Sequence, residues 1–254
     1  YAYPVVSQSY QGFLMKKPQL TTNLSENLEK LHVNREKASK LFADVIEKAV
    51  KKSKPDSLTA PTVATDTDTP TITPKPMPLK ITVLGGGSFG TAMANLSAKN
   101  GCDVTLWVRD KRSVRAMQKT HINKKYLPDH KLDERLQFTH DLATAVKDKD
   151  LLFVAVPSSA FRETLQKIAP FITAQAIISL TKGMEKDTFA LMSDIIAEEL
   201  PNVAFGVMSG PNLAKEIMNN MPSATVIASE SEALRLAAQK ALHSAFFRVF
   251  ASDD

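Results

Sequence analysis

From residue 79 onward, short apolar runs alternate with amphipathic stretches. The runs at 81–84 and 151–156 show little polar alternation, which is typical of strands that are covered on both faces of a sheet. Between the runs, apolar residues recur at spacings of three and four, which predicts helices. The predicted strands are 79–84, 103–108, 136–139, 151–156, 176–180, 204–208, 224–228 and 247–251. The predicted helices are 89–100, 111–119, 142–147, 159–168, 188–199, 213–219 and 232–244.

This alternation of strands and helices predicts the fold class. Parallel strands need a crossover segment between them, and that segment is usually a helix. Alternating strands and helices are therefore typical of an α/β fold with a doubly wound, mainly parallel sheet. We expect residues 79–254 to form one domain of this class.

The first 78 residues show other patterns. Residues 1–24 form an irregular tail, whereas residues 25–52 place apolar side chains on one stripe after Ser25, which can cap a helix. Residues 53–78 contain six prolines and seven threonines, and proline removes backbone donors and keeps a chain extended. The α/β domain is thus predicted to be preceded by a tail, an amphipathic helix and a disordered linker.

The apolar stripe of the predicted 25–52 helix needs a covering surface. Its polar face mixes both charge signs, which favours packing or self-association, and so a possible homodimer, over a membrane surface. Met15-Lys16-Lys17 resembles a translation start, so residues 1–14 are expected to be upstream sequence.

Composition and charge exclude several classes of protein. The chain is 43% hydrophobic and 23% charged, which excludes a wholly disordered chain, and no uncharged apolar run approaches the roughly 20 residues of a membrane-spanning helix. The net charge of +5 has no concentrated basic block of the kind that a nucleic-acid partner needs. The histidines lack metal-ligand spacing, so no metal is expected. A single cysteine, Cys102, favours a reducing compartment, hence a cytoplasmic protein with a buried structural thiol.

Glycine placement carries the sharpest local signal. Four of the nine glycines lie in the run Gly85-Gly86-Gly87-Ser88-Phe89-Gly90, which fits G-x-G-x-x-G between a predicted strand and a predicted helix. Gly85 allows the tight turn, Gly87 lacks the Cβ that would block a pyrophosphate, and Gly90 lets the helix approach the strand. The helix start adds free N–H groups and the positive end of its dipole. We therefore predict a Rossmann-like domain that binds a dinucleotide.

The end of the second predicted strand bears on the type of cofactor. An acidic residue there would bond the ribose 2′-hydroxyl of NAD, but this chain has Arg109 followed by Asp110. Arg109 suits the 2′-phosphate of NADP and could also stack on adenine. Asp110 lies one step further and could instead cap the next helix. The expectation is NADP, with NAD tolerated.

Further motifs follow the glycine turn in a characteristic order. They are Thr91-Ala92, Leu106-Trp107, Tyr126-Leu127-Pro128 in an expected loop, Val-Ala-Val-Pro-Ser at 154–158, Thr181-Lys182-Gly183, and Ser209-Gly210-Pro211 with Ala214-Lys215-Glu216. With these motifs, residues 79–254 resemble the N-terminal domain of bacterial NAD(P)-dependent glycerol-3-phosphate dehydrogenases. The Thr-Lys-Gly and Ser-Gly-Pro motifs are the specific ones, and residues 1–78 are left unexplained.

The resemblance implies roles for individual residues. Residues that would touch the cofactor are Gly85, Gly87, Ser88, Phe89, Gly90, Arg109, Ala214 and, as a lesser candidate, Phe161. Lys182 would lie where nicotinamide and substrate meet and contact both, and Gly210 and Asn212 would line the substrate site. Independently of the resemblance, Lys182 and Asn212 follow the ends of predicted strands, where open α/β sheets bind ligands. A lysine there can hold an anionic substrate or polarise a carbonyl oxygen.

Two positions depart from the family pattern. Gly86 stands where alanine is usual, and Asn212-Leu213 stands where threonine or serine followed by phenylalanine is usual. The first change is conservative. Asparagine can still donate and accept hydrogen bonds, so contact with substrate is retained with a changed geometry.

The resemblance also implies an activity, the interconversion of dihydroxyacetone phosphate and sn-glycerol 3-phosphate for glycerophospholipid synthesis. The family's helical C-terminal domain, with its proton-transfer lysine, would lie beyond Asp254, so this chain is expected to bind cofactor and turn over little. The alternatives are a related ketopantoate- or hydroxyacid-type reductase and a cofactor-binding module without catalysis. The Thr-Lys-Gly and Ser-Gly-Pro pair argues against the first alternative.

Overall fold

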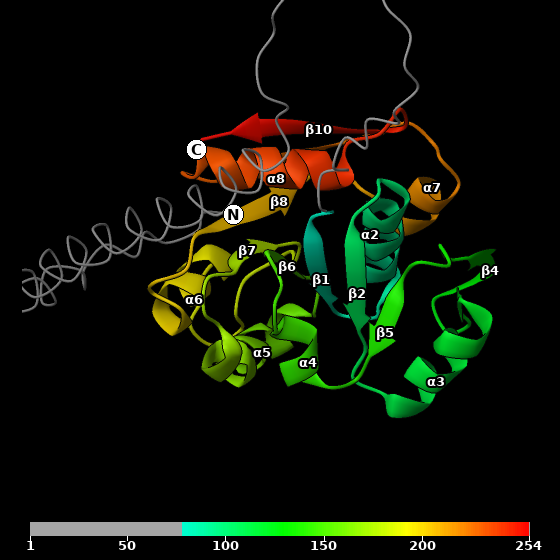
Figure 1. Ribbon diagram of the computed structural model, residues 1–254. Helices are drawn as coiled ribbons and strands as arrows, with labels where there is room; N and C mark the ends of the chain where they lie inside the picture. The colour runs from blue at the N-terminus through cyan, green and yellow to red at the C-terminus, as the bar shows by residue number, and fades with distance from the viewer. Residues whose placement is uncertain (1–77, 254) are drawn as a thin grey trace, which may run out of the picture.

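The computed structural model describes residues 78–253. The predicted tail (1–24), helix (25–52) and linker (53–78) therefore lie outside the described residues, apart from Pro78. In the described part, helices lie on both sides of a central sheet (Figure 1).

Every strand and helix predicted after residue 78 is present, with its ends within four residues of the prediction. The strands of the large sheet are β1 (Lys80–Leu84), β2 (Asp103–Trp107), β5 (Gln137–Thr139), β6 (Leu151–Val154), β7 (Ala176–Ser179), β8 (Phe205–Ser209), β9 (Ser223–Ala228) and β10 (Phe247–Ser252). The α-helices are α2 (Ser88–Lys99), α3 (Lys111–Thr120), α4 (Leu142–Val146), α5 (Phe161–Ile168), α6 (Met192–Glu199), α7 (Ala214–Met218) and α8 (Glu232–Leu242). Single turns of 3₁₀ helix, Ser158–Ala160 and Ala169–Phe171, flank α5.

The order of strands across the sheet is β10-β9-β8-β7-β6-β1-β2-β5. All neighbours are parallel except β8 and β9, so β9 and β10 run against the rest. This confirms the predicted doubly wound, mainly parallel, Rossmann-like sheet. The chain proceeds outward from β1 in both directions, through β2 on one side and β6 on the other. A ligand crevice is expected at such a switch point, beyond the carboxyl ends of the strands.

Two apolar cores cover the sheet, one on each face. Ile81 and Val83 on β1 face the core formed with α2, α3, α7 and α8, whereas Leu84 faces the core formed with α4, α5 and α6. All three side chains are fully buried, which explains why the strand shows little polar alternation. The predicted burial of Cys102 is confirmed, and burial raises the pKa of its thiol.

A two-stranded antiparallel sheet corrects the expectation of a loop around Tyr126. It consists of β3 (Ile122–Asn123) and β4 (Leu127–Lys131), so Leu127 and Pro128 belong to a strand, whereas Tyr126 lies in the turn formed by residues 124–126. The strands are too short to show the period-2 pattern in the sequence. The buried side chain of Leu127 anchors the hairpin in the first core.

The helix predicted at 188–199 begins later, at Met192. Phe189 adopts a left-handed conformation with φ +57°, which a continuous helix does not allow. The Asp194 carboxylate accepts a hydrogen bond from the Leu191 N–H at 3.1 Å and so caps the helix at its actual start. The residues before it form a loop that is closed by a bridge between Met184 and Leu191.

Candidate functional site

The glycine-rich turn between β1 and α2 is built as the motif requires. Gly85 has φ +130°, and a Cβ on it would lie 2.4 Å from the Ala155 carbonyl oxygen. A Cβ on Gly90 would lie 2.1 Å from the Gly85 oxygen, so the helix and strand approach as closely as glycine permits. A Cβ on Gly87 would meet no atom within 4 Å, so that position faces open space. No side chain caps α2, which leaves its amino end available to a ligand.

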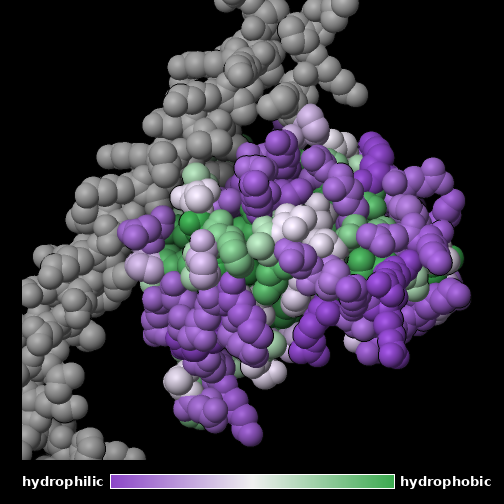
Figure 2. All heavy atoms as spheres, turned by 60° about the horizontal axis from the view of Figure 1, so that its bottom comes forward, coloured by the Kyte–Doolittle hydropathy of each residue, from purple (hydrophilic) through white to green (hydrophobic). Residues whose placement is uncertain are grey.

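This open space is part of a cleft of about 1190 Å³ at the carboxyl ends of the central strands. The segments that line it follow β1, β2, β6, β7 and β8; they are 85–90, 107–110, 155–160, 180–182 and 212–214, joined by Lys125, Tyr126 and α5 residues. Figure 2 shows this side of the molecule, with apolar and near-neutral residues gathered between hydrophilic ones. The volume is large enough for an extended ligand of dinucleotide size.

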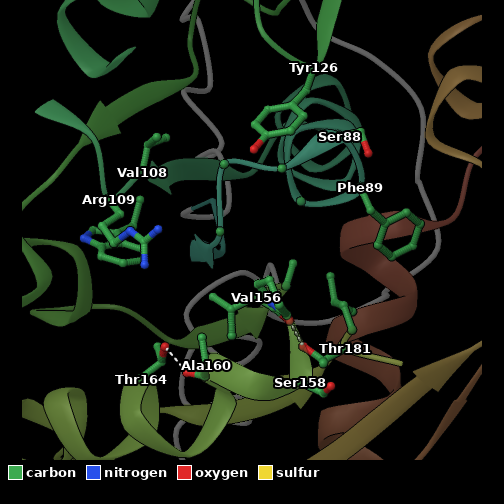
Figure 3. A pocket seen from close by; sticks show the side chains of 18 of the residues that line it. Ser88, Phe89, Val108, Arg109, Tyr126, Val156, Ser158, Ala160, Thr164 and Thr181 are labelled. Atoms are coloured by element: carbon green, nitrogen blue, oxygen red, sulfur yellow. Dashed lines mark hydrogen bonds between the residues drawn. The ribbon is translucent and has the colours of Figure 1, made fainter. Parts of the chain in front are cut away.

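One side of the cleft carries Arg109. In Figure 3, Arg109 and Val108 lie on one side, Phe89 and Thr181 lie on the other, and Tyr126 and Ser88 lie near the glycine turn. The neighbouring Asp110 carboxylate accepts hydrogen bonds from the N–H groups of Arg112 and Ser113, at 3.3 and 2.9 Å. The suggested helix cap at Asp110 is thereby confirmed, and bonding to Ser113 lowers the pKa of that carboxyl.

Lys182 lies where the segments after β7 and β8 meet. Its Nζ donates a hydrogen bond of 2.5 Å to the carbonyl oxygen of Gly210, and Lys182 lines the cleft. Just before it, the Thr181 hydroxyl donates to the Val156 oxygen at 2.7 Å, which ties the segments after β6 and β7 together (Figure 3). The ammonium group is thus held by a neutral carbonyl oxygen, which an anionic ligand could replace.

Asn212 lies on the same wall and is 8% exposed. Its Nδ2 donates a hydrogen bond to the Ala224 oxygen at 2.7 Å, whereas its buried Oδ1 has no hydrogen-bond partner among the described residues. A buried acceptor without a donor is costly, so this oxygen is an unsatisfied polar group in a residue that lines the cleft.

The structure brings most of the predicted site residues together in this one cleft. They are Gly85, Gly87, Ser88, Phe89, Gly90, Arg109, Lys182, Asn212 and Ala214. Gly210 does not line the cleft and is connected to it through its bond with Lys182. Phe161 is fully buried in the core beneath α5, so the structure does not support it as a cofactor contact. Several other residues line the cleft without a role predicted from the sequence, among them Tyr126, Ser158 and Thr164.

Gly86 is a less conservative departure than the sequence implies. A Cβ on Gly86 would lie 2.6 Å from Cγ2 of Val108. The glycine and the valine that faces it are therefore matched in size. An alanine at this position requires Val108 to move.

Fold and site together define the class of protein: a Rossmann-like domain with a glycine-rich turn at the switch point of its sheet. Residues 80–235 match the family model described as NAD-dependent glycerol-3-phosphate dehydrogenase N-terminus. The chain belongs to this family.

Curated relatives and solved structures agree with this membership. The glycerol-3-phosphate dehydrogenase [NAD(P)+] of Psychrobacter arcticus is 66% identical over 248 residues, covering 98% of this chain and 53% of that protein. The enzyme of the same name from Acinetobacter baumannii strain AYE is 64% identical over 176 residues, covering 69% of this chain and 49% of that protein. The chain thus spans about half the length of the curated relatives it matches.

Among solved structures, glycerol-3-phosphate dehydrogenase from Coxiella burnetii is 35% identical with a TM-score of 0.67, covering 70% of this chain and 55% of that one. A ketopantoate reductase from Ralstonia eutropha is 17% identical with a TM-score of 0.51, and that likeness concerns the fold alone. It covers 69% of this chain and 57% of the reductase chain.

Within residues 78–253, no group of three or more His, Cys, Asp or Glu side chains could hold a metal ion. None of the helices in this part is both long enough and apolar enough to cross a membrane.

Proposed function

We propose that this chain is the dinucleotide-binding part of an NAD(P)-dependent enzyme that interconverts dihydroxyacetone phosphate and sn-glycerol 3-phosphate for glycerophospholipid synthesis. One observation carries the proposal: a single cleft joins an open glycine turn to a lysine and an unpaired buried asparagine oxygen. Family membership supports the choice of substrate. A ketopantoate- or hydroxyacid-type reductase shares only the fold with this chain.

The described residues fit a dinucleotide. The space at Gly87 and the uncapped amino end of α2 would take the pyrophosphate, with Ser88, Phe89 and Ala214 beside it. Arg109, on the far side, would bind the adenosine end, where a guanidinium suits a 2′-phosphate. We therefore propose NADP as the preferred cofactor, with NAD accepted.

The substrate would lie at the Lys182 end of the cleft. When bound, the dinucleotide supplies the hydride that reduces the carbonyl carbon of the substrate, while a proton must reach the carbonyl oxygen. Lys182 would exchange its bond to the Gly210 oxygen for one to the substrate and hold it, and Asn212 Oδ1 would accept from a substrate hydroxyl.

We propose a cytoplasmic protein in which residues 79–254 form the dinucleotide-binding domain after a tail, a helix and a linker. The amphipathic stretch 25–52 is the proposed contact of a homodimer. Light scattering of the full chain and of a chain starting at residue 79 tests this, because only the full chain should self-associate.

Direct titration of the chain with NADPH and NADH tests the proposed function. The enhanced fluorescence of bound NADPH, or isothermal calorimetry, reports the dissociation constants. The matched variant is Gly87→Ala, whose Cβ meets no protein atom and so should leave the melting temperature unchanged. It should weaken both cofactors by about tenfold or more, because the methyl group occupies the space of the pyrophosphate.

Gly101→Ala is the control variant, since this glycine lies outside the cleft. It has φ +87°, so it should lower stability without changing affinity for the folded protein. Absence of NADPH and NADH binding by the folded wild-type chain would contradict the proposed function.

A further inference from the structure

Arg162 contacts three carboxylates and does not itself line the cleft. It is the second residue of α5, and its guanidinium contacts Glu185 in the loop after β7 and both Glu198 and Glu199 at the end of α6. The side chains of Arg162, Glu185 and Glu199 are half-buried, whereas that of Glu198 is 56% exposed. Such a cluster joins three chain segments at one point.

The pair with Glu185 differs from the other two because two guanidinium nitrogens contact the carboxylate. Arg162 Nε donates to Oε1 of Glu185 at 2.8 Å and Nη2 donates to Oε2 at 2.9 Å, which is a bidentate arrangement. The Thr188 hydroxyl donates to the same Oε2 at 2.6 Å. The backbone N–H of Glu185 donates to the Ala190 oxygen at 3.0 Å, and that of Phe189 donates back to the Glu185 oxygen at 3.0 Å. The loop between β7 and α6 is thus closed around Glu185.

This loop begins at the cleft. Lys182 precedes Glu185 by three residues, and between them Gly183 turns the chain with φ +102°. On the other side, Arg162 follows directly on the 155–160 wall of the cleft. The same two walls are tied once by Thr181 and Val156, before Lys182, and again by Arg162 and Glu185, after it. The two ties bracket Lys182.

We propose that Arg162 is a positioning residue: by holding Glu185, it fixes the turn that presents Lys182 to the nicotinamide and substrate end of the cleft. The inference rests on the proposed function, because it needs a dinucleotide in the cleft. A merely structural link between α5 and α6 needs only Glu198 and Glu199. The two interpretations therefore differ in what Glu185 does.

The test compares Glu185→Gln with Glu199→Gln. Each variant removes one carboxylate charge from the same guanidinium, and the two side chains are almost equally exposed, at 18% and 19%. Only Glu185 belongs to the Lys182 loop. The two probes are NADPH and 2′-phospho-ADP-ribose, which lacks the nicotinamide, and both are titrated against the full 254-residue chain.

Glu185→Gln should weaken NADPH by roughly three- to tenfold, in line with the loss of one well-placed interaction at the nicotinamide end. It should leave the affinity for 2′-phospho-ADP-ribose unchanged, and Glu199→Gln should change neither affinity. In a Lys182→Ala background, Glu185→Gln should have no further effect, because the two changes act through one group. Thr188→Ala, which loosens the same carboxylate, should shift the NADPH affinity in the same direction by less.

The inference would be overturned if Glu185→Gln and Glu199→Gln lowered the NADPH affinity equally, or if Glu185→Gln lowered the affinity for both probes equally. Neither result would contradict the proposed function. The same holds if the effect of Glu185→Gln persists without Lys182. A wild-type chain that binds neither probe instead contradicts the proposed function itself. Thermal melting of each variant confirms folding, and Thr188→Ala decides the question if Glu185→Gln does not fold.

Discussion

Adjacent residues after β2 are used in different ways. Arg109 lines the cleft, whereas the Asp110 carboxylate accepts bonds from two backbone N–H groups and from the Ser113 hydroxyl at 2.6 Å. Both residues lie at the rim of the cleft. Three donors already bind this carboxylate in capping α3, which leaves it fewer free acceptor sites for a ribose hydroxyl. This division favours the arginine as the residue that determines cofactor type.

The cofactor preference can be tested at Arg109. Arg109→Gln should weaken NADPH by about tenfold or more and leave NADH within about twofold, because a bidentate contact to phosphate is lost. Fluorescence titration with both cofactors gives the two ratios. Arg112→Gln removes a neighbouring arginine that does not line the cleft and should change neither. An equal loss of NADPH and NADH would instead indicate stacking of Arg109 on adenine.

At the scale of elements, helix ends are set by local hydrogen bonds. Helix α8 starts after Ser231, which is 5% exposed. The Ser231 hydroxyl accepts a hydrogen bond from the Leu234 N–H at 3.3 Å. Helix α6 starts behind Leu191 because Asp194 caps it there. The segment between β7 and α6 has no helix of its own and is closed by backbone hydrogen bonds of Glu185 with Phe189 and Ala190.

The cap of α8 can be measured directly. Ser231→Ala should lower the free energy of unfolding by about 1 kcal/mol, because a buried helix N–H loses its acceptor. Urea denaturation monitored by circular dichroism gives the value. Ser231→Thr keeps the hydroxyl and should recover most of the loss. Equal stability of the alanine variant and the wild type would show that α8 does not need this cap.

The Glu185 pair gives the loop a dependence on pH. Hydrogen bonds from Arg162 and Thr188 lower the pKa of Glu185 from 4.5 to about 2. A carboxyl whose pKa is lower in the folded state stabilises it above its unfolded pKa, and this contribution is lost as pH falls toward the folded value. The difference in unfolding free energy between wild type and Glu185→Gln should therefore be constant above pH 4.5 and shrink between pH 4.5 and 2. Urea midpoints across this range test it, and a difference that grows on acidification would contradict it.

At the scale of the whole molecule, the cleft depends on cores that do not touch a ligand. The side chain of Phe161 is fully buried and packs beneath the cleft wall from which α5 starts. The core on the other face holds α2, and with it the glycine turn, against β1 and β2. The geometry of the site is therefore a product of packing on both faces of the sheet.

Phe161 and Phe89 should separate stability from binding. Phe161→Ala should lower the free energy of unfolding by about 3–5 kcal/mol, the usual cost of a large cavity, and should change the NADPH affinity of the folded protein less than Phe89→Ala does. Phe89 lines the cleft, so Phe89→Ala should weaken the binding of NADPH and lower the free energy of unfolding by a smaller amount. Denaturation and titration of both variants decide this. A Phe161→Ala variant that keeps its stability but binds NADPH weakly would indicate that Phe161 contacts the cofactor.

The sequence by itself determined the strands, the helices, the glycine turn and most residues of the cleft. These features can be predicted locally, because the spacing of apolar residues indicates a strand or a helix, and glycine marks positions that need unusual backbone conformations. The positions just after the strands then indicated the site, since parallel strands end at one edge of a sheet. Two local features were not predicted from the apolar pattern. A short strand pairing forms β3 and β4 where a loop was expected, and the cap at Asp194 makes α6 start later than expected.

Only the tertiary structure decided which distant residues meet. Arg162 contacts carboxylates that lie 23 and 37 residues further along the chain, and the local spacing of residues does not predict such contacts. The reversed direction of β9 and β10, the burial of Phe161 and the unpaired oxygen of Asn212 also depend on packing between elements. The sequence does not show whether a charged residue on a helix is exposed to solvent or forms an ion pair with another segment. Its role is decided by the free energy of bringing three segments together, which belongs to the folded molecule as a whole.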